Sequence, residues 1–352
     1  MSNDPVTSPE IGAGGKAAVA VDRICTIGGA GTKLGSFFDL RNERALVQFS
    51  PDSASLLVAF RSSIAVFDAR SGTQQVQGDL RTLFSGSEFG SSTPYAIFAD
   101  IVAGTTLLGV AYDGHCVVLD PFKGADQEVL KLTAGSILGK GFVFETGGIA
   151  RNGKGIIAGA HFRYIQFDLN KKDEEPKGIN GPFAKKLVTV SPDGGCFAAV
   201  PQQGDTVDIQ RLDDGQRIHR IKHSKWFARL EAGVSDIKFT PGTPCVLIAH
   251  RKGMMMEQHL SMWDIRSGAL SWTCKAGGEP TTVVRLAVTP DGSMLLSAEG
   301  PLIRVRDTGT GNALAAIDAP EGGCVAIVWA PDCQTFATVG KNGGGAVFRL
   351  RA

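Results

Sequence analysis

Short runs of consecutive apolar residues, separated by turn residues, recur along most of the chain. Residues 49–72 read FSPDSASLLVAFRSSIAVFDARSG, and related stretches follow at 239–268 and 288–311. A strand with one solvated face alternates apolar and polar residues, whereas an unbroken apolar run indicates a strand covered on both faces. Proline followed by Asp or Gly closes a tight turn between two such strands. The pattern therefore predicts an all-β chain of short strands that are covered on both faces.

The turns between the first and second runs set the length of the repeat. They read SPD at 50–52 and 191–193, TPG at 240–242, TPD at 289–291 and APD at 330–332. The first two prolines are 141 residues apart, which is three times 47, and the later intervals are 49, 49 and 41. Two weaker units fill the long interval, at 96–120 with a turn at 102–104 and at 142–168 with a turn at 151–153. The chain therefore holds seven units.

Each unit is predicted to form four strands. A tight turn such as Asp113-Gly114 follows the second run, and the third run ends on an aromatic or aliphatic residue plus Asp, as in Phe67-Asp68 and Trp263-Asp264. A turn such as RSG then leads to a fourth, more polar strand. Four-stranded units that cover one another front and back predict a seven-bladed, all-β propeller of antiparallel blades. An α/β fold would need helical segments between the strands, and the sequence has almost none.

This pattern resembles the WD-repeat family of propellers and covers nearly the whole chain. Trp263-Asp264 is the one Trp-Asp dipeptide, and the family's Gly-His pair is absent from all seven units, so the resemblance rests on period and strand order. It implies one propeller domain over residues 17–352. Residues 1–16 are expected to be a disordered tail.

The ends of the chain predict how the ring closes. The last unit stops after its third strand, at 346–350, and so lacks a fourth. The segment at 17–22, AAVAVD, is an extra strand with no unit of its own. We expect this N-terminal strand to complete the last blade, which would remove an open sheet edge.

Composition narrows the class of protein. Charged residues are 20% of the chain and the net charge is +1, so no global attraction to nucleic acid or to an anionic membrane is expected. The seven cysteines are odd in number and have no C-x-x-C spacing, which favours a reducing, cytoplasmic setting over a disulfide framework or a zinc site. The N-terminus lacks the apolar core of a signal peptide, and no apolar run is long enough to span a membrane.

Catalytic and cofactor motifs are not indicated. The six histidines do not recur at equivalent positions of the units, as the ligands of an axial metal would, and no G-x-S-x-G occurs. The glycine-rich stretches at 28–31 and 343–345 precede no helix and lack phosphate-loop spacing. We therefore expect no catalytic residue, metal ligand or cofactor.

One part of the chain combines charge with binding-type residues. Between 217 and 252 there are eight Lys or Arg against two acidic residues, a local balance of +6. The sequence predicts that 217–233 connects the fourth and fifth blades and that 250–259 is a long loop on the same rim. Arg, Trp and Met are enriched at binding sites. The candidate partner-binding residues are Lys222, Lys225, Trp226, Arg229, Arg251, Lys252, Met254, Met255 and Met256.

The function expected from these features is a non-catalytic protein-interaction scaffold. Its partner would be a protein with an acidic or mixed surface, bound at the rim of blades 4 and 5, and nucleic acid and membrane are not expected as partners. One alternative is that Trp226 and Phe227 pack into the rim while the methionines cap the central channel. The alternative from another class is a propeller enzyme, a lactonase, other hydrolase or oxidoreductase, with its site in that channel.

Overall fold

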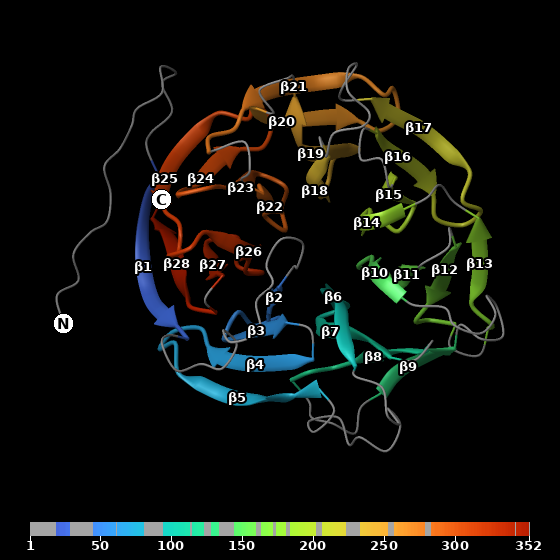
Figure 1. Ribbon diagram of the computed structural model, residues 1–352, viewed down its shortest axis with the longest axis horizontal. Helices are drawn as coiled ribbons and strands as arrows, with labels where there is room; N and C mark the ends of the chain where they lie inside the picture. The colour runs from blue at the N-terminus through green and yellow to red at the C-terminus, as the bar shows by residue number, and fades with distance from the viewer. Residues whose placement is uncertain are drawn as a thin grey trace.

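The computed structural model describes residues 19–28, 45–60, 62–80, 94–112, 115–122, 128–133, 144–159, 163–171, 174–180, 184–201, 206–222, 233–252, 257–278, 283–341 and 343–351. These residues form seven four-stranded antiparallel sheets arranged as blades around a common axis (Figure 1). The predicted seven-bladed β-propeller is confirmed. The predicted tail at 1–16 lies outside the described residues.

Each blade has an inner strand beside the axis and a second strand paired with it. The inner strands are β2 (Leu46–Phe49), β6 (Tyr95–Val102), β10 (Phe144–Ile149), β14 (Ala184–Val190), β18 (Val234–Phe239), β22 (Arg285–Val288) and β26 (Cys324–Trp329). The second strands are β3 (Ser55–Phe60), β7 (Thr105–Tyr112), β11 (Lys154–Gly159), β15 (Cys196–Pro201), β19 (Cys245–Lys252), β23 (Met294–Glu299) and β27 (Thr335–Gly340).

A third strand and an outer strand complete each blade. The third strands are β4 (Ser63–Asp68), β8 (His115–Leu119), β12 (Arg163–Asp168), β16 (Thr206–Arg211), β20 (Glu257–Asp264), β24 (Leu302–Asp307) and β28 (Gly345–Arg351). The outer strands are β5 (Gln74–Asp79), β9 (Glu128–Thr133), β13 (Lys177–Asn180), β17 (Arg217–Lys222), β21 (Leu270–Lys275), β25 (Ala313–Asp318) and β1 (Ala20–Ile27).

The N-terminal strand closes the ring, as the sequence predicts. β1 pairs antiparallel with β28, so the last blade has the order β1-β28-β27-β26. The strand covers Ala20–Ile27, a few residues later than the predicted segment at 17–22. Val21 and Ile27 are buried, and Ile27 packs in the core between blades 7 and 1. Closure is therefore made by side-chain packing as well as by the backbone ladder.

Seven clusters of buried apolar side chains each lie between two adjacent blades. The cluster between blades 1 and 7, for example, joins Phe49 and Leu56 to Val325 and Ala337. Because each blade is packed on both sides, its middle strands are apolar on both faces. This explains why the apolar runs do not alternate with polar residues.

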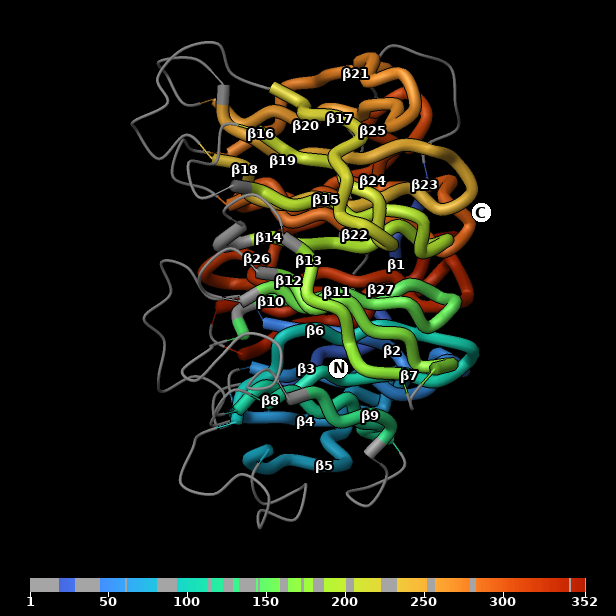
Figure 2. Tube along the Cα trace, turned by 90° about the vertical axis from the view of Figure 1, so that its right-hand side faces the viewer, coloured from blue at the N-terminus to red at the C-terminus, as the bar shows by residue number. Residues whose placement is uncertain are grey.

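The recurrent Ser/Thr-Pro turns are held by the hydroxyl that precedes the proline. Ser50 Oγ accepts from the Ser55 amide at 2.9 Å, and Ser191 and Thr289 accept in the same way from the amide five residues on, at 3.0 and 2.9 Å. Blade 2 lacks this motif and uses a different turn. Its hairpin turns through Ala103 and Gly104, whose φ angles of 48° and 77° are both positive, as in a type I′ turn. Chain geometry puts these turns on one face of the ring, called here the turn face; Figure 2 shows the ring edge-on.

The turns between third and outer strands also lie on the turn face and contact the neighbouring blade. Asp264, which ends a third strand, accepts from the Ser267 amide at 2.7 Å, so this Asp caps its turn. The glycine that follows, as at Gly72 with φ of +73°, lies against the outer strand of the preceding blade. A Cβ on Gly72 would come within 2.0 Å of the Thr26 carbonyl oxygen of β1. These turns therefore join the blades at the perimeter of the ring.

A buried ionic network joins blades 5 and 6. The Glu299 carboxylate, whose side chain is fully buried, accepts hydrogen bonds from Arg306 Nη2 at 2.6 Å, Ser297 Oγ at 2.6 Å and the Gly277 amide at 2.7 Å, and it also pairs with Arg304. Arg306 in turn donates to the Gly311 carbonyl at 2.8 Å. The charges of Glu299 and Arg306 therefore both have partners inside the protein. Without such partners, burying these charges would be strongly destabilising.

Candidate functional site

The predicted partner-binding surface at blades 4 and 5 is described only in part. Lys222 is the last residue of β17 and is exposed, Arg251 lies near the end of β19 and is half-buried, and Lys252 ends β19. The remaining six candidates lie outside the described residues: Lys225, Trp226, Arg229, Met254, Met255 and Met256. The apolar anchors of the surface therefore remain a prediction.

The structure corrects the predicted lengths of both loops. Residues Arg217–Lys222 form the outer strand β17 and pair with β16, so they are not part of the connection between blades. β19 and β20 stay paired out to Lys252 and Glu257, which leaves 253–256 to join them in place of the loop predicted at 250–259. These strand segments consist largely of polar residues, so the pattern of apolar runs does not indicate them.

Histidine and acidic side chains line the end of blade 5. The rings of His250 and His259 lie directly across the ladder and stack with centroids 6.1 Å apart. Glu257 accepts from Lys275 Nζ at 2.7 Å and lies 3.5 Å from His259 Nε2. The Lys275 hydrogen bond and charge lower the pKa of Glu257, with a smaller effect from His259. The carboxylate at this corner is thus already matched by Lys275.

Strand β17 carries most of the described positive charge at this surface. Arg220 forms a two-point ion pair with the buried Asp208, with Nε–Oδ1 and Nη2–Oδ2 distances of 2.6 and 2.7 Å. A ring nitrogen of His219 lies 2.9 Å from the Arg266 carbonyl of blade 5. Arg217 and Lys222 are exposed, and within the described part of the chain they form no ion pair. These two charges face solvent.

Charged residues also occur on the inner strands and at their turns. Arg285 donates from Nε to the Val325 carbonyl at 3.0 Å and from Nη1 to the Ser235 carbonyl at 3.2 Å, and so ties blade 6 to both neighbours. On the turn face, Arg151 of blade 3 reaches the Pro290 carbonyl of blade 6 at 3.0 Å. Both arginines hold backbone carbonyls of other blades, which is a structural use of their charge.

Among the acidic side chains with a resolved pKa shift, Asp100 on the inner strand β6 has the largest. Burial raises the pKa of Asp100 to about 6, while the charge of Lys238 and a hydrogen bond from the Ile149 amide act in the opposite direction. A carboxyl that titrates near neutral pH can serve as a general acid or base, although structural sites also show such shifts.

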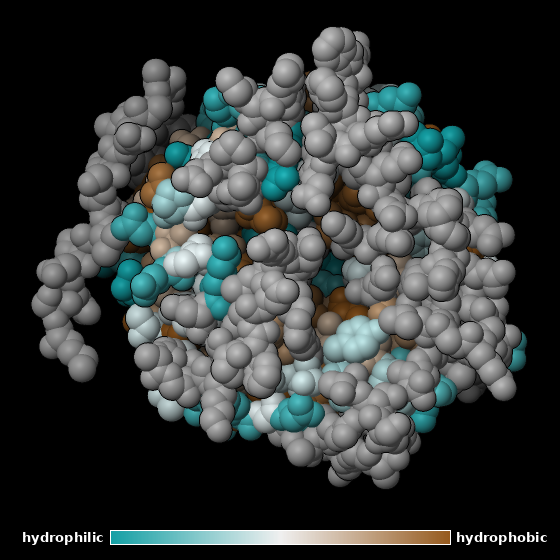
Figure 3. All heavy atoms as spheres, viewed as in Figure 1, coloured by the Kyte–Doolittle hydropathy of each residue, from teal (hydrophilic) through white to brown (hydrophobic). Residues whose placement is uncertain are grey.

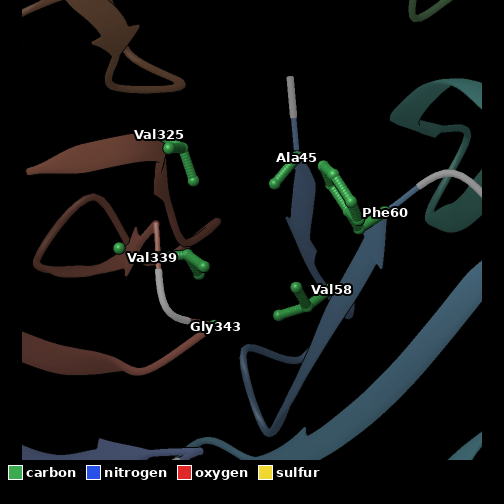
Figure 4. A pocket seen from close by; sticks show the side chains of 7 residues that line it. Ala45, Val58, Phe60, Val325, Val339 and Gly343 are labelled. Atoms are coloured by element: carbon green, nitrogen blue, oxygen red, sulfur yellow. The ribbon is translucent and has the colours of Figure 1, made fainter. Parts of the chain in front are cut away.

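A small apolar pocket lies between blades 7 and 1 (Figure 4). It is lined by Ala45, Val58, Phe60, Val325, Val339, Gly340 and Gly343. Its cavity volume is about 10 Å³, roughly the room of one water molecule. No lining side chain carries a polar group, so this pocket offers neither the space nor the chemistry for catalysis.

Thiol chemistry and metal binding find little support in the described part of the chain. All seven cysteines are free, and burial raises the pKa of every one, for Cys324 to about 12. Protonated thiols are poor nucleophiles.

Within the described ranges, no three His, Cys, Asp or Glu side chains gather as metal ligands would. Nor does any helix in those ranges have the length and hydropathy needed to cross a bilayer.

The fold places the protein in the class of seven-bladed β-propellers. The resemblance to WD repeats extends to blade number and strand order. No known protein family and no curated protein matches the sequence.

Proposed function

We propose that this protein is a non-catalytic interaction scaffold that binds a protein partner with an acidic or mixed surface at blades 4 and 5. The observation that carries the proposal is the exposed positive charge of Arg217 and Lys222 on β17, close along the chain to the predicted anchor Trp226. Three acids lie on β16 or in the turn before β17, and each is paired with another cation: Asp208 with Arg220, Asp213 with Lys154 and Asp214 with Arg211.

Such a surface acts mainly on the encounter between partners. Exposed cations steer an acidic surface into place and raise the association rate, an effect that salt screens over about 8–10 Å. Affinity would then depend on buried apolar anchors, for which Trp226 and Met254 to Met256 are the candidates. The proposal therefore predicts that salt slows association more than it changes dissociation.

Charge reversal at this surface is expected to abolish partner capture. The variant replaces Lys222, Lys225, Arg251 and Lys252 with Glu, and the matched control reverses four exposed cations of other blades, Arg70, Lys171, Lys177 and Arg349. Proteins retained from native cell extract are identified by mass spectrometry, after circular dichroism shows that all forms are folded. We expect a partner that wild type and control retain and the variant loses, with its affinity for the purified variant reduced at least about tenfold.

Equal retention by the variant and the wild type would contradict a binding site at blades 4 and 5. Loss from both the variant and the control would show that general surface charge, and not this surface, determines capture.

Catalysis at the ring axis is the second candidate function, and the raised pKa of Asp100 is the observation that favours it. It predicts small-molecule turnover that depends on a group titrating near pH 6 and that Asp100→Asn abolishes. Arg151 and Arg285, two further charged groups near the axis, hold backbone carbonyls. This arrangement gives catalysis less support than binding.

The stability of Asp100→Asn tests the same carboxyl without a substrate. Because the folded pKa of about 6 lies above the ordinary 3.8, the folded chain binds this proton more tightly, and the carboxyl destabilises the fold as pH rises through 6. We expect the variant to be more stable than wild type at pH 8, by up to about 2–3 kcal/mol, with the difference vanishing near pH 4. Urea unfolding at both pH values measures this; a constant difference would show that Asp100 is not perturbed.

A further inference from the structure

Among the described residues, the outer strand of blade 4 has an open hydrogen-bonding edge. β17 pairs with β16 on its inner side, and no described strand pairs with its outer side. In Figure 1 it lies at the perimeter of the ring, and in Figure 3 that margin is coloured for hydrophilic residues. An outer edge presents backbone N–H and C=O groups that an extended peptide can pair with as an added strand.

β17 differs from every other outer strand in charge. Its sequence RIHRIK has three Lys or Arg, one His and no acid in six residues. Each of the other outer strands carries at most one Lys or Arg: AVDRICTI, QQVQGD, EVLKLT, KGIN, LSWTCK and ALAAID. A strand added beside β17 would therefore meet positive charge and no acidic residue of β17, which favours an acidic peptide.

The side chains of β17 divide into those that fix the strand and those that face solvent. Arg220 is tied to the buried Asp208, His219 contacts the Arg266 carbonyl, and Ile221 is buried. Arg217 and Lys222 are exposed at the two ends of the strand, and Ile218, with 40% of its surface exposed, adds an apolar contact between them. A strand held in this way keeps its edge in place for a partner, which lowers the ordering cost of binding.

We propose that the outer edge of β17 binds an acidic, extended peptide segment, which adds as a fifth strand to blade 4. The inference rests on the proposed function and specifies its binding mode: backbone pairing gives affinity, and cross-strand pairs with Arg217 and Lys222 select for acidic side chains. Charged edge strands also protect proteins against edge-to-edge aggregation. The positive charge of β17 repels basic strands and is complementary to an acidic one.

The test uses the full chain and three labelled heptapeptides in fluorescence-anisotropy titrations. One peptide alternates Glu and Val, a second alternates Lys and Val, and a third has three consecutive prolines between two pairs of Glu. The third keeps the acidic charge but cannot pair as a strand, because consecutive prolines leave both of its edges without N–H groups to donate. The protein variants are Arg217→Glu with Lys222→Glu, and the control Arg70→Glu with Lys171→Glu at exposed positions of blades 1 and 3.

We expect only the Glu-Val peptide to bind, with affinity reduced at least about tenfold by the β17 variant and unchanged by the control. Equal binding of the Glu-Pro peptide would overturn strand addition in favour of charge attraction alone. No binding of the Glu-Val peptide, or equal binding to the β17 variant, would also overturn it. If the Glu-Val peptide does not bind while partner capture still depends on blades 4 and 5, the scaffold function stands without strand addition. If the peptide binds at β17 while partner capture does not depend on blades 4 and 5, the scaffold function is removed and the peptide site remains.

Discussion

Removal of residues 1–27 is expected to abolish the folded ring. The deletion takes away β1, whose pairs run from Ala20 opposite Arg351 to Ile27 opposite Gly345, and leaves β28 as an open, apolar edge. It also removes the buried Val21 and Ile27, each worth about 1.5–3 kcal/mol. Together with the lost ladder, this is comparable with the whole stability of a typical domain, about 5–15 kcal/mol.

The measurement is the melting temperature, with light scattering to detect aggregates. The matched control removes residues 1–18 and keeps β1 intact, so we expect it to melt as the full chain does. A deletion of residues 1–27 that kept the melting temperature of the full chain would show that β1 does not hold the ring closed.

The second large effect is expected from Glu299→Ala. This change leaves Arg306, with a side chain only 6% exposed, without the carboxylate that compensates its charge. Breaking a buried ion pair on one side costs about 3–5 kcal/mol. Because the network joins the end of blade 5 to blade 6, the loss should appear as lower stability of the whole ring. Urea unfolding followed by tryptophan fluorescence measures it.

The control for this prediction is Glu257→Ala, which breaks the exposed pair with Lys275. Surface pairs contribute about 0–1 kcal/mol, so little change is expected. A double variant, Glu299→Leu with Arg306→Met, should recover part of the loss because it removes the uncompensated charge. If Glu299→Ala were no more destabilising than Glu257→Ala, the buried network would not contribute to stability as its geometry implies.

The fold follows from local patterns that the sequence displays openly. A hydroxyl before proline sets the turn, as at Ser50, and an apolar run covered on both faces marks the strands beside it. Blades 2 and 3 lack the proline, yet the 47-residue period locates their turns, at Ala103-Gly104 and Asn152-Gly153. The closing strand is predictable because the last blade lacks a fourth strand and the N-terminal strand belongs to no other blade.

The candidate site was predicted less well, for physical reasons. The sequence shows the cations of β17 but predicts a connection between blades there, because Arg, His and Lys interrupt the apolar pattern that marks a strand. The pairing of Arg220 with Asp208 depends on strand register, and the contact of Arg151 with Pro290 spans 139 residues and arises only when the ring closes. The prediction for Trp226 and the three methionines concerns residues outside the described ranges.

The register of β1 against β28 also determines how the ring responds to tension. Ala20 lies opposite Arg351, so the chain enters and leaves the closing blade at the same end of one antiparallel pair. A force that pulls these two ends apart would load the ladder one residue pair at a time, like a zipper, and not all pairs together in shear. A ring held by seven packed interfaces can therefore be opened mechanically from a single pair of residues.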